Sequence, residues 1–176
     1  KLNVPPSHYI EMPTPGDQDT INSCVAWAVG YGMLSYQYRV IEDNSDYNGL
    51  NKVFSPNYIY NQLNGGQNIG QKSISYSLDL IKNQGCCKMV DMSNLKDIIT
   101  QPSPQARQNA ADYTIEDYQI FPRVDIQQMK VFISKGYTIP FACTIDEGFM
   151  YGHKPSFTLK DAKYVYTKQV GKYLGD

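Results

Sequence analysis

The stretch GDQDTINSCVAWAVGYGM, from Gly16 to Met33, changes abruptly from a polar loop into an apolar run that begins at Cys24. After that thiol, apolar residues recur at steps of three and four, which predicts a helix from Cys24 to Val40. Ser23 immediately precedes the run and is a candidate N-cap. Two glycines inside the helix weaken it, so we expect burial against other elements to hold it together.

The composition is that of an ordinary globular protein. Of the 176 residues, 41% are hydrophobic and 19% are charged, and the net charge is -1. Such a balanced charge argues against nucleic-acid binding, and no apolar run approaches the roughly 18 residues of a membrane-spanning helix. Because the chain begins at Lys1 without methionine, we expect a trimmed form. Its location stays open, with a secreted or cell-envelope protein favoured over a cytoplasmic one.

Along the chain, helical patterns come first and strand patterns later. Capping residues and apolar periodicity predict further helices at residues 57–63, 73–83 and 124–135, and apolar alternation or continuity predicts strands at residues 113–122, 137–145 and 157–166. Residues 88–110 contain Pro102 and Pro104 and are expected to be irregular. This order of elements is typical of an α+β protein with two lobes.

Residues that bind metals are scarce. The cysteines and histidines are Cys24, Cys86, Cys87, Cys143, His8 and His153, without any C-x-x-C spacing. This set predicts no metal site, and it permits disulfides without requiring them.

The position of Cys24 favours a role as a nucleophile. At the first turn of a helix, unpaired backbone N–H groups carry partial positive charge and favour a thiolate, the nucleophilic form of cysteine. Gln18, across a tight loop, can direct its side-chain NH2 group toward the anion that forms on an attacked carbonyl. The alternative for Cys24 is a small buried hydrophobic residue, the commoner role of a free cysteine.

One pattern resembles a known family. Q-x5-C-x-A-W-A, formed by Gln18, Cys24, Ala26, Trp27 and Ala28, resembles the papain-like cysteine peptidases (C1 family), and SCVAWAVGY is most similar to their bacterial branch. The segments FSPNYIYNQLNGG, SYSLDLIKNQGC and VDIQQMKVFISKGYTIPFACTIDEGF follow in the family's order. They resemble its second helix with an Asn-Gly-Gly strip, its third helix, and the helix and strand that open its β-rich lobe.

The resemblance covers nearly the whole chain and implies an α+β, papain-like, two-lobed fold. Residues 1–14 would form an extended lead-in, residues 15–112 the helical lobe, and residues 113–176 an incomplete β-barrel-like lobe. Cys24 would be the nucleophile and Gln18 an oxyanion donor. Gly65 and Gly66 would present their backbone to an extended substrate peptide, although a helix C-cap is an equal interpretation of this pair. No cofactor and no metal are implied.

The sequence departs from the family's pattern in the loop before the thiol. Asp19 and Asn22 stand where the family usually has glycine, and we expect Asn22 to keep the turn by adopting positive φ. Asp19 brings a carboxylate that disfavours a nearby thiolate. The family's disulfide between this loop and the Asn-Gly-Gly strip is absent. Ile21 and Leu63 take its two positions, which predicts a hydrophobic contact between them.

The family's catalytic histidine has no counterpart within these residues. By the resemblance it would immediately follow Asp176, whereas His153 and His8 are interpreted as surface residues. We therefore expect a thiol endopeptidase acting on peptide or protein substrates, with a C-terminal segment or a second chain completing the β lobe and covering apolar strand edges at residues 137–143. The alternatives are a catalytically inactive module that binds peptides or a protein partner, and a structural scaffold with a buried Cys24.

Overall fold

The computed structural model describes residues 4–5, 7–42, 46–70, 73–121, 123–143, 145–146 and 173–175. The chain divides into two units, Lys1–Pro140 and Phe141–Asp176. All helices of the described residues belong to the first unit, and the second holds the short antiparallel pair β1 (Ile145–Asp146) and β2 (Tyr173–Gly175). The domain boundary expected between residues 112 and 113 stays a prediction.

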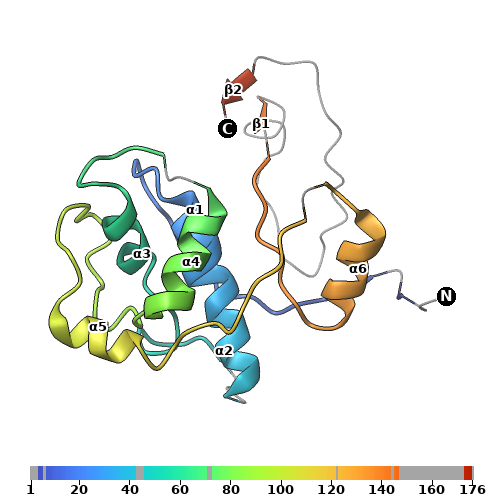
Figure 1. Cartoon of the computed structure of the whole chain (residues 1–176), viewed down its shortest axis with the longest axis horizontal. Helices are drawn as coiled ribbons and strands as arrows, with labels where there is room; N and C mark the ends of the chain where they lie inside the picture. The colour runs from blue at the N-terminus through green and yellow to red at the C-terminus, as the bar shows by residue number, and fades with distance from the viewer. Residues whose placement is uncertain are drawn as a thin grey trace. The chain divides into compact units, whose positions relative to one another are not determined.

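A continuous helical rod begins at Cys24, as predicted. It consists of α1 (Cys24–Ala26), the π-helical segment η1 (Trp27–Leu34) and α2 (Ser35–Ile41) (Figure 1). Within η1, a Cβ atom added to Gly30 would lie 2.8 Å from Ile59 Cδ1, so this glycine allows the next helix to approach closely. Ser23 precedes the rod, but its side chain makes no capping hydrogen bond.

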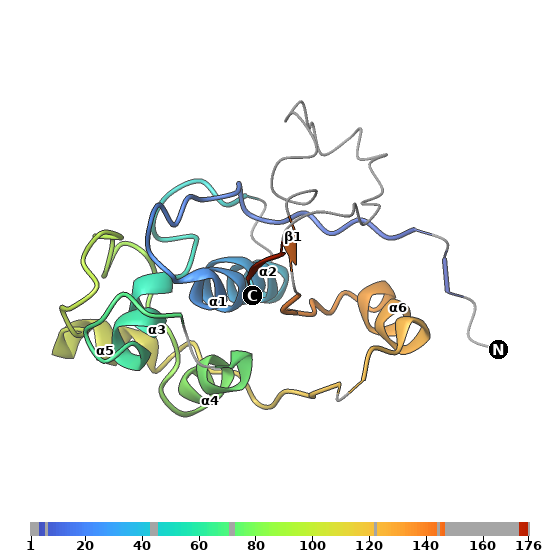
Figure 2. The ribbon, with the colours of Figure 1, turned by 90° about the horizontal axis from the view of Figure 1, so that it is seen from above.

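Two predicted helices lie beside the rod in both views (Figures 1 and 2), namely α3 (Pro56–Leu63) and α4 (Ile74–Gln84). Ser55 caps α3 by accepting a hydrogen bond from Tyr58 N–H at 3.4 Å, and Pro56 occupies the first turn. The apolar faces of these helices and the rod form the core, whose fully buried side chains include Val29, Leu34, Phe54, Tyr58, Ile59, Tyr60 and Ile81.

One helix was not predicted. The segment expected to be irregular contains α5 (Pro104–Ala110), which Ser103 caps by accepting a hydrogen bond from Ala106 N–H at 3.1 Å. Ser-Pro opens α5 just as it opens α3, but Pro102 and Pro104 were interpreted only as turn signals. Proline is favoured at the first helical position, because its missing N–H needs no partner there and its fixed φ suits a helix.

The expected strand at residues 113–122 is wrong for residues 113–121, which contain no strand. Tyr113, Ile115 and Tyr118 pack against the core from an extended loop, and this burial produced the apolar alternation. Tyr113 meets the rings of Tyr38 and Phe54 at centroid distances of 5.1 and 5.2 Å. Side-chain burial without a hydrogen-bonded neighbour does not make a strand.

The expected strand at residues 137–145 is also wrong for residues 137–143, and only its end, Ile145, lies in a strand. β1 pairs with β2 in the register Ile145↔Gly175 and Asp146↔Tyr173. Tyr137 and Phe141 are exposed but do not belong to strands, so the apolar strand edge expected at residues 137–143 is absent from these residues. The expected strand at residues 157–166 lies outside the described residues. The helical lobe is thus supported, and the β-rich lobe stays a prediction.

The last predicted helix is confirmed as α6 (Ile126–Ser134). Asp125 caps it by accepting a hydrogen bond from Gln128 N–H at 3.0 Å. Phe132 packs against the rings of Phe121 and Tyr137, at centroid distances of 5.4 and 5.7 Å. No side chain of α6 is fully buried, so its apolar face is only partly covered by the described residues.

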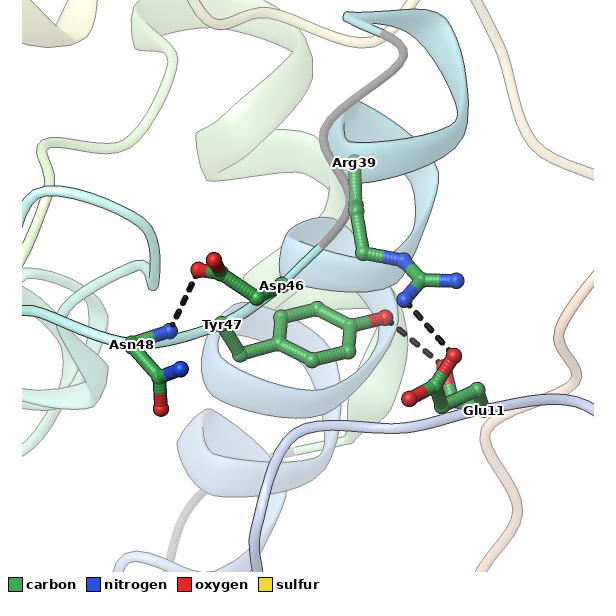
Figure 3. Close-up of polar contacts among 5 residues, drawn as sticks. All are labelled: Glu11, Arg39, Asp46, Tyr47 and Asn48. Atoms are coloured by element: carbon green, nitrogen blue, oxygen red, sulfur yellow. Dashed lines mark hydrogen bonds and ion pairs between the residues drawn. The ribbon is translucent and has the colours of Figure 1, made fainter.

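The N-terminal lead-in is fixed to the rod by a polar cluster (Figure 3). Glu11 accepts a hydrogen bond from Arg39 Nη1 at 2.9 Å, and its backbone carbonyl accepts one from the Tyr47 hydroxyl at 2.8 Å. Burial raises the pKa of Tyr47 to about 12, so that hydroxyl remains a donor. Further along, the Tyr31 hydroxyl donates to Thr14 O at 2.8 Å. These contacts set the direction from which the chain enters the loop before Cys24.

Candidate active site around Cys24

Cys24 is exposed and is the first residue of α1. This location contradicts its interpretation as a small buried hydrophobic residue, a role that Cys86 and Cys87 have instead, both being 0% exposed. Cys143 is exposed as well, and all four cysteines are free thiols. An exposed thiol at a helix start is open to reaction.

Consecutive turns shape the loop that carries Cys24. Ile21 N–H donates to Gln18 O at 3.1 Å, and Ile21 O accepts from Ser23 N–H at 2.8 Å. Ser23 O then accepts from Trp27 N–H at 3.0 Å, which starts the helix. Because each of these hydrogen bonds closes a short turn, local backbone bonding orders the loop up to Cys24.

Gln18 lies at the start of this loop with its side chain half-buried. Together with Trp27, Tyr31 and residues of the lead-in, it lines a hollow of about 340 Å³. The side-chain amide of Gln18 makes no hydrogen bond to the described residues, so its NH2 group is available to a ligand. The predicted role of Gln18 as an oxyanion donor stays a prediction.

The turn residue with positive φ is Asp19, with φ 53°, and the expectation that Asn22 takes this conformation is wrong. Asp19 N–H donates to Asp17 Oδ1 at 2.7 Å, a local bond that helps an aspartate tolerate the left-handed region. The carboxylate of Asp19 lies 3.8 Å from Lys96 Nζ, with both side chains largely exposed. A lysine therefore stands beside the negative charge that was expected to act on the thiolate.

The sequence analysis missed Asn68, which joins the loop to the strip that follows α3. Its Oδ1 accepts from Asn22 N–H at 2.9 Å, and its Nδ2 donates to Thr20 O at 3.0 Å. Its position two residues after the Asn-Gly-Gly strip is the one signal that could have drawn attention to it. Ile21 and Leu63 both pack against the core, while the contact predicted between them stays a prediction.

Gly65 and Gly66 follow the end of α3 with φ of 65° and 77°. The helix C-cap interpretation is confirmed, because Asn64 is the C-cap residue and its Oδ1 accepts from Gly66 N–H at 2.8 Å. An added Cβ atom at either glycine would have no atom within 4 Å, so the strip is open on that side. Substrate binding by this pair stays a prediction, and a peptide carbonyl would compete with Asn64 for the N–H of Gly66.

No imidazole pairs with Cys24 in the described part of the chain. His8 is exposed in the lead-in, without a hydrogen bond to the thiol, and His153 lies outside the described residues. Within the same residues, no cluster of His, Cys, Asp and Glu side chains is suited to a metal ion. None of the described helices has the length and apolar character to cross a membrane.

No family model and no curated protein matches the sequence. Among solved structures, the chain is similar to xylellain, a cysteine protease from Xylella fastidiosa, with a TM-score of 0.52 and 20% sequence identity. The match covers 70% of this chain and 52% of that chain, so the chain spans about half the length of xylellain. At this identity the likeness is one of fold alone.

Proposed function

We propose that the chain carries the nucleophile half of a papain-like thiol endopeptidase, with Cys24 as the attacking residue. The observation that carries the proposal is an exposed thiol on the first residue of a long helix. The loop before it is hydrogen-bonded to Asn68, two residues after the open glycine pair Gly65 and Gly66. The fold likeness to a cysteine protease agrees with this arrangement. The proposed substrates are peptides or proteins in extended conformation.

In the proposed reaction, the Cys24 thiolate attacks the carbonyl carbon of the scissile peptide bond. The carbonyl π electrons move to oxygen, and the resulting anion accepts hydrogen bonds from backbone N–H at the helix start and from the Gln18 amide. Collapse expels the amine, which takes a proton from a general acid, and leaves a thioester that water hydrolyses. The conjugate base of that acid is the imidazole that first removes the thiol proton.

The first prediction concerns the source of this imidazole. The 176-residue chain alone is expected to show no measurable peptide hydrolysis, because His8 is a lead-in residue without contact to the thiol. Where the natural polypeptide continues beyond residue 176, the extended chain is expected to cleave peptides, since acid–base help is typically worth about 10²–10⁴-fold. A fluorogenic peptide assay on both proteins measures the difference. Hydrolysis by the 176-residue chain that His8→Ala or His153→Ala abolishes would contradict it.

The same comparison tests a second function, that of an inactive module that binds peptides. The observation that favours this alternative is that His8, an exposed residue of the lead-in, makes no hydrogen bond to Cys24. Its signature is saturable binding of a peptide library by the extended chain without any cleavage, measured by calorimetry and mass spectrometry.

The reactivity of the thiols provides a second prediction. Under native conditions, iodoacetamide is expected to modify Cys24 several-fold faster than exposed Cys143, and at least about 100-fold faster than Cys86 and Cys87. Burial shields the latter two, and it raises the pKa of Cys86 and raises that of Cys87 to about 12. Time-resolved mass spectrometry of the labelled peptides measures all four rates. Equal rates at Cys24 and Cys143 would show that the helix start does not activate the thiol.

A further inference from the structure

We infer that Asn68 is a positioning residue, whose side-chain amide holds the Cys24 loop against the strip that begins at Gly65. This inference rests on the proposed function for its catalytic consequence, and on the contacts of Asn68 for the link itself. It identifies a non-covalent connection between two chain segments that are distant in sequence.

The side chain of Asn68 recognises two backbone groups of the loop. Its Oδ1 accepts the N–H of Asn22 at 2.9 Å, and its Nδ2 donates to the carbonyl of Thr20 at 3.0 Å. The backbone carbonyl of Asn68 also accepts a hydrogen bond from Asn22 Nδ2 at 3.4 Å. A primary amide is the side-chain group that offers a carbonyl acceptor and an NH2 donor side by side. Aspartate has the same shape but lacks the donor.

These bonds complete the loop's own hydrogen bonding. The backbone N–H and C=O of Ile21 are used inside the loop, by Gln18 and Ser23. The groups on either side of Ile21, Thr20 O and Asn22 N–H, are the ones that Asn68 engages. Because the loop is already ordered internally, Asn68 acts on its position as a unit rather than on its shape.

The other end of the connection is fixed in the core by Tyr60. Its ring is 0% exposed, and its hydroxyl lies 3.2 Å from Asn68 Oδ1 and 3.1 Å from Ile69 O. Burial is the largest cause that raises the pKa of Tyr60, so the hydroxyl remains a donor. A hydroxyl has one hydrogen and donates to one acceptor at a time. Either hydrogen bond attaches the strip to the buried side chain of Tyr60.

This connection has a consequence for catalysis. A nucleophile must be held close to its attack geometry, and a displacement of about 1 Å can cost about 10²-fold in rate. The hydrogen bonds of the Asn68 side chain hold the thiol-bearing loop at one distance from the strip, without a disulfide. The link is therefore insensitive to reducing agents, unlike a disulfide.

The test compares Asn68→Ala and Asn68→Asp with Gln67→Ala, a control from the same strip whose side chain makes no hydrogen bond to the described residues. Amide hydrogen exchange on the 176-residue chain reports the link directly. Asn68→Ala removes the acceptor of Asn22 N–H and is expected to accelerate exchange at Asn22 by about tenfold, the equilibrium effect of one lost hydrogen bond. Asn68→Asp keeps that acceptor and loses only the bond to Thr20 O, so its effect at Asn22 is expected to be smaller, and Gln67→Ala leaves exchange unchanged. Unchanged exchange at Asn22 in Asn68→Ala overturns the link, whether or not the protein is a peptidase.

Peptide hydrolysis by the extended chain then tests the catalytic consequence. The Asn68 variants are expected to lower kcat by about 10- to 100-fold with a smaller change in KM, while thermal unfolding of the core shifts little. Faster exchange at Asn22 with unchanged kcat overturns the positioning role. If the extended wild-type chain hydrolyses no peptide, the proposed function fails, and the exchange result still decides whether Asn68 holds the loop.

Discussion

Replacing Cys24 by alanine is expected to abolish peptide hydrolysis by the extended chain, with kcat falling by roughly 10⁴-fold or more. The thiol is the atom that forms the covalent intermediate, and alanine offers no nucleophile in its place. Stability is expected to change by no more than about 0.5 kcal/mol, because Cys24 is exposed and its side chain makes no hydrogen bond to the described residues. Loss of activity without loss of stability separates a chemical role from a structural one.

The matched control is Cys143→Ala, which removes the other exposed thiol. Its hydrolysis rate is expected to equal that of the wild type, and thermal unfolding of both variants is followed by circular dichroism. Turnover retained by Cys24→Ala, or lost equally in Cys143→Ala, would rule out Cys24 as the nucleophile.

Replacing Gly85 by alanine is expected to lower the free energy of unfolding by about 3–5 kcal/mol, among the largest effects of any single substitution. Gly85 ends α4 with φ 74°, a conformation that disfavours a side chain. An added Cβ atom would overlap the carbonyl oxygen of Ala110 and lie 2.7 Å from its carbonyl carbon. That carbonyl is held at 2.9 Å by Tyr113 N–H, and Tyr113 O accepts from Cys86 N–H at 3.2 Å. Neither backbone segment can yield without breaking these bonds.

Two other glycines separate the effect of a positive φ from the effect of an overlapping Cβ atom. Gly65 has φ 65° but open space around an added Cβ atom, so Gly65→Ala is expected to cost only about 1 kcal/mol. Gly70 has neither a positive φ nor a neighbouring atom within 4 Å, and Gly70→Ala is expected to be neutral within about 0.5 kcal/mol. Urea unfolding of the three variants gives the comparison. Equal stabilities of Gly85→Ala and Gly65→Ala would mean that the end of α4 does not approach Ala110 as described.

Local signals in the sequence were sufficient for most of the helices. The rod from Cys24, α3, α4 and α6 follow from apolar periodicity together with Ser55, Pro56 and Asp125 at their starts. Helical hydrogen bonds join residues four apart, so the information that specifies a helix lies within a few turns. The missed helix α5 carries the same Ser-Pro start, which shows that the signal was present and was outweighed by two prolines.

A strand depends on a second segment that bonds to its backbone, and the sequence did not predict which segments pair. Tyr113 and Ile115 alternate like a strand because their side chains reach the core. The hydrogen bond from Cys86 N–H to Tyr113 O does not extend into a strand ladder in the described residues. The apolar run from Tyr137 to Cys143 likewise forms no strand. A strand forms through hydrogen bonds to residues that are distant in sequence, so its existence is decided by the tertiary arrangement.

The candidate site also has features that local sequence predicts and features that only tertiary contacts decide. The sequence by itself determined that a thiol begins a long helix and that a glycine pair ends the next one, because helix starts and helix ends are local. Only the tertiary structure decided that Asp19, not Asn22, takes the positive φ, and that Asn68 holds the loop from 46 residues away. Asparagine and aspartate tolerate many turn positions, and an amide can bond to any nearby backbone. Their roles therefore follow from which groups the fold brings within hydrogen-bond distance.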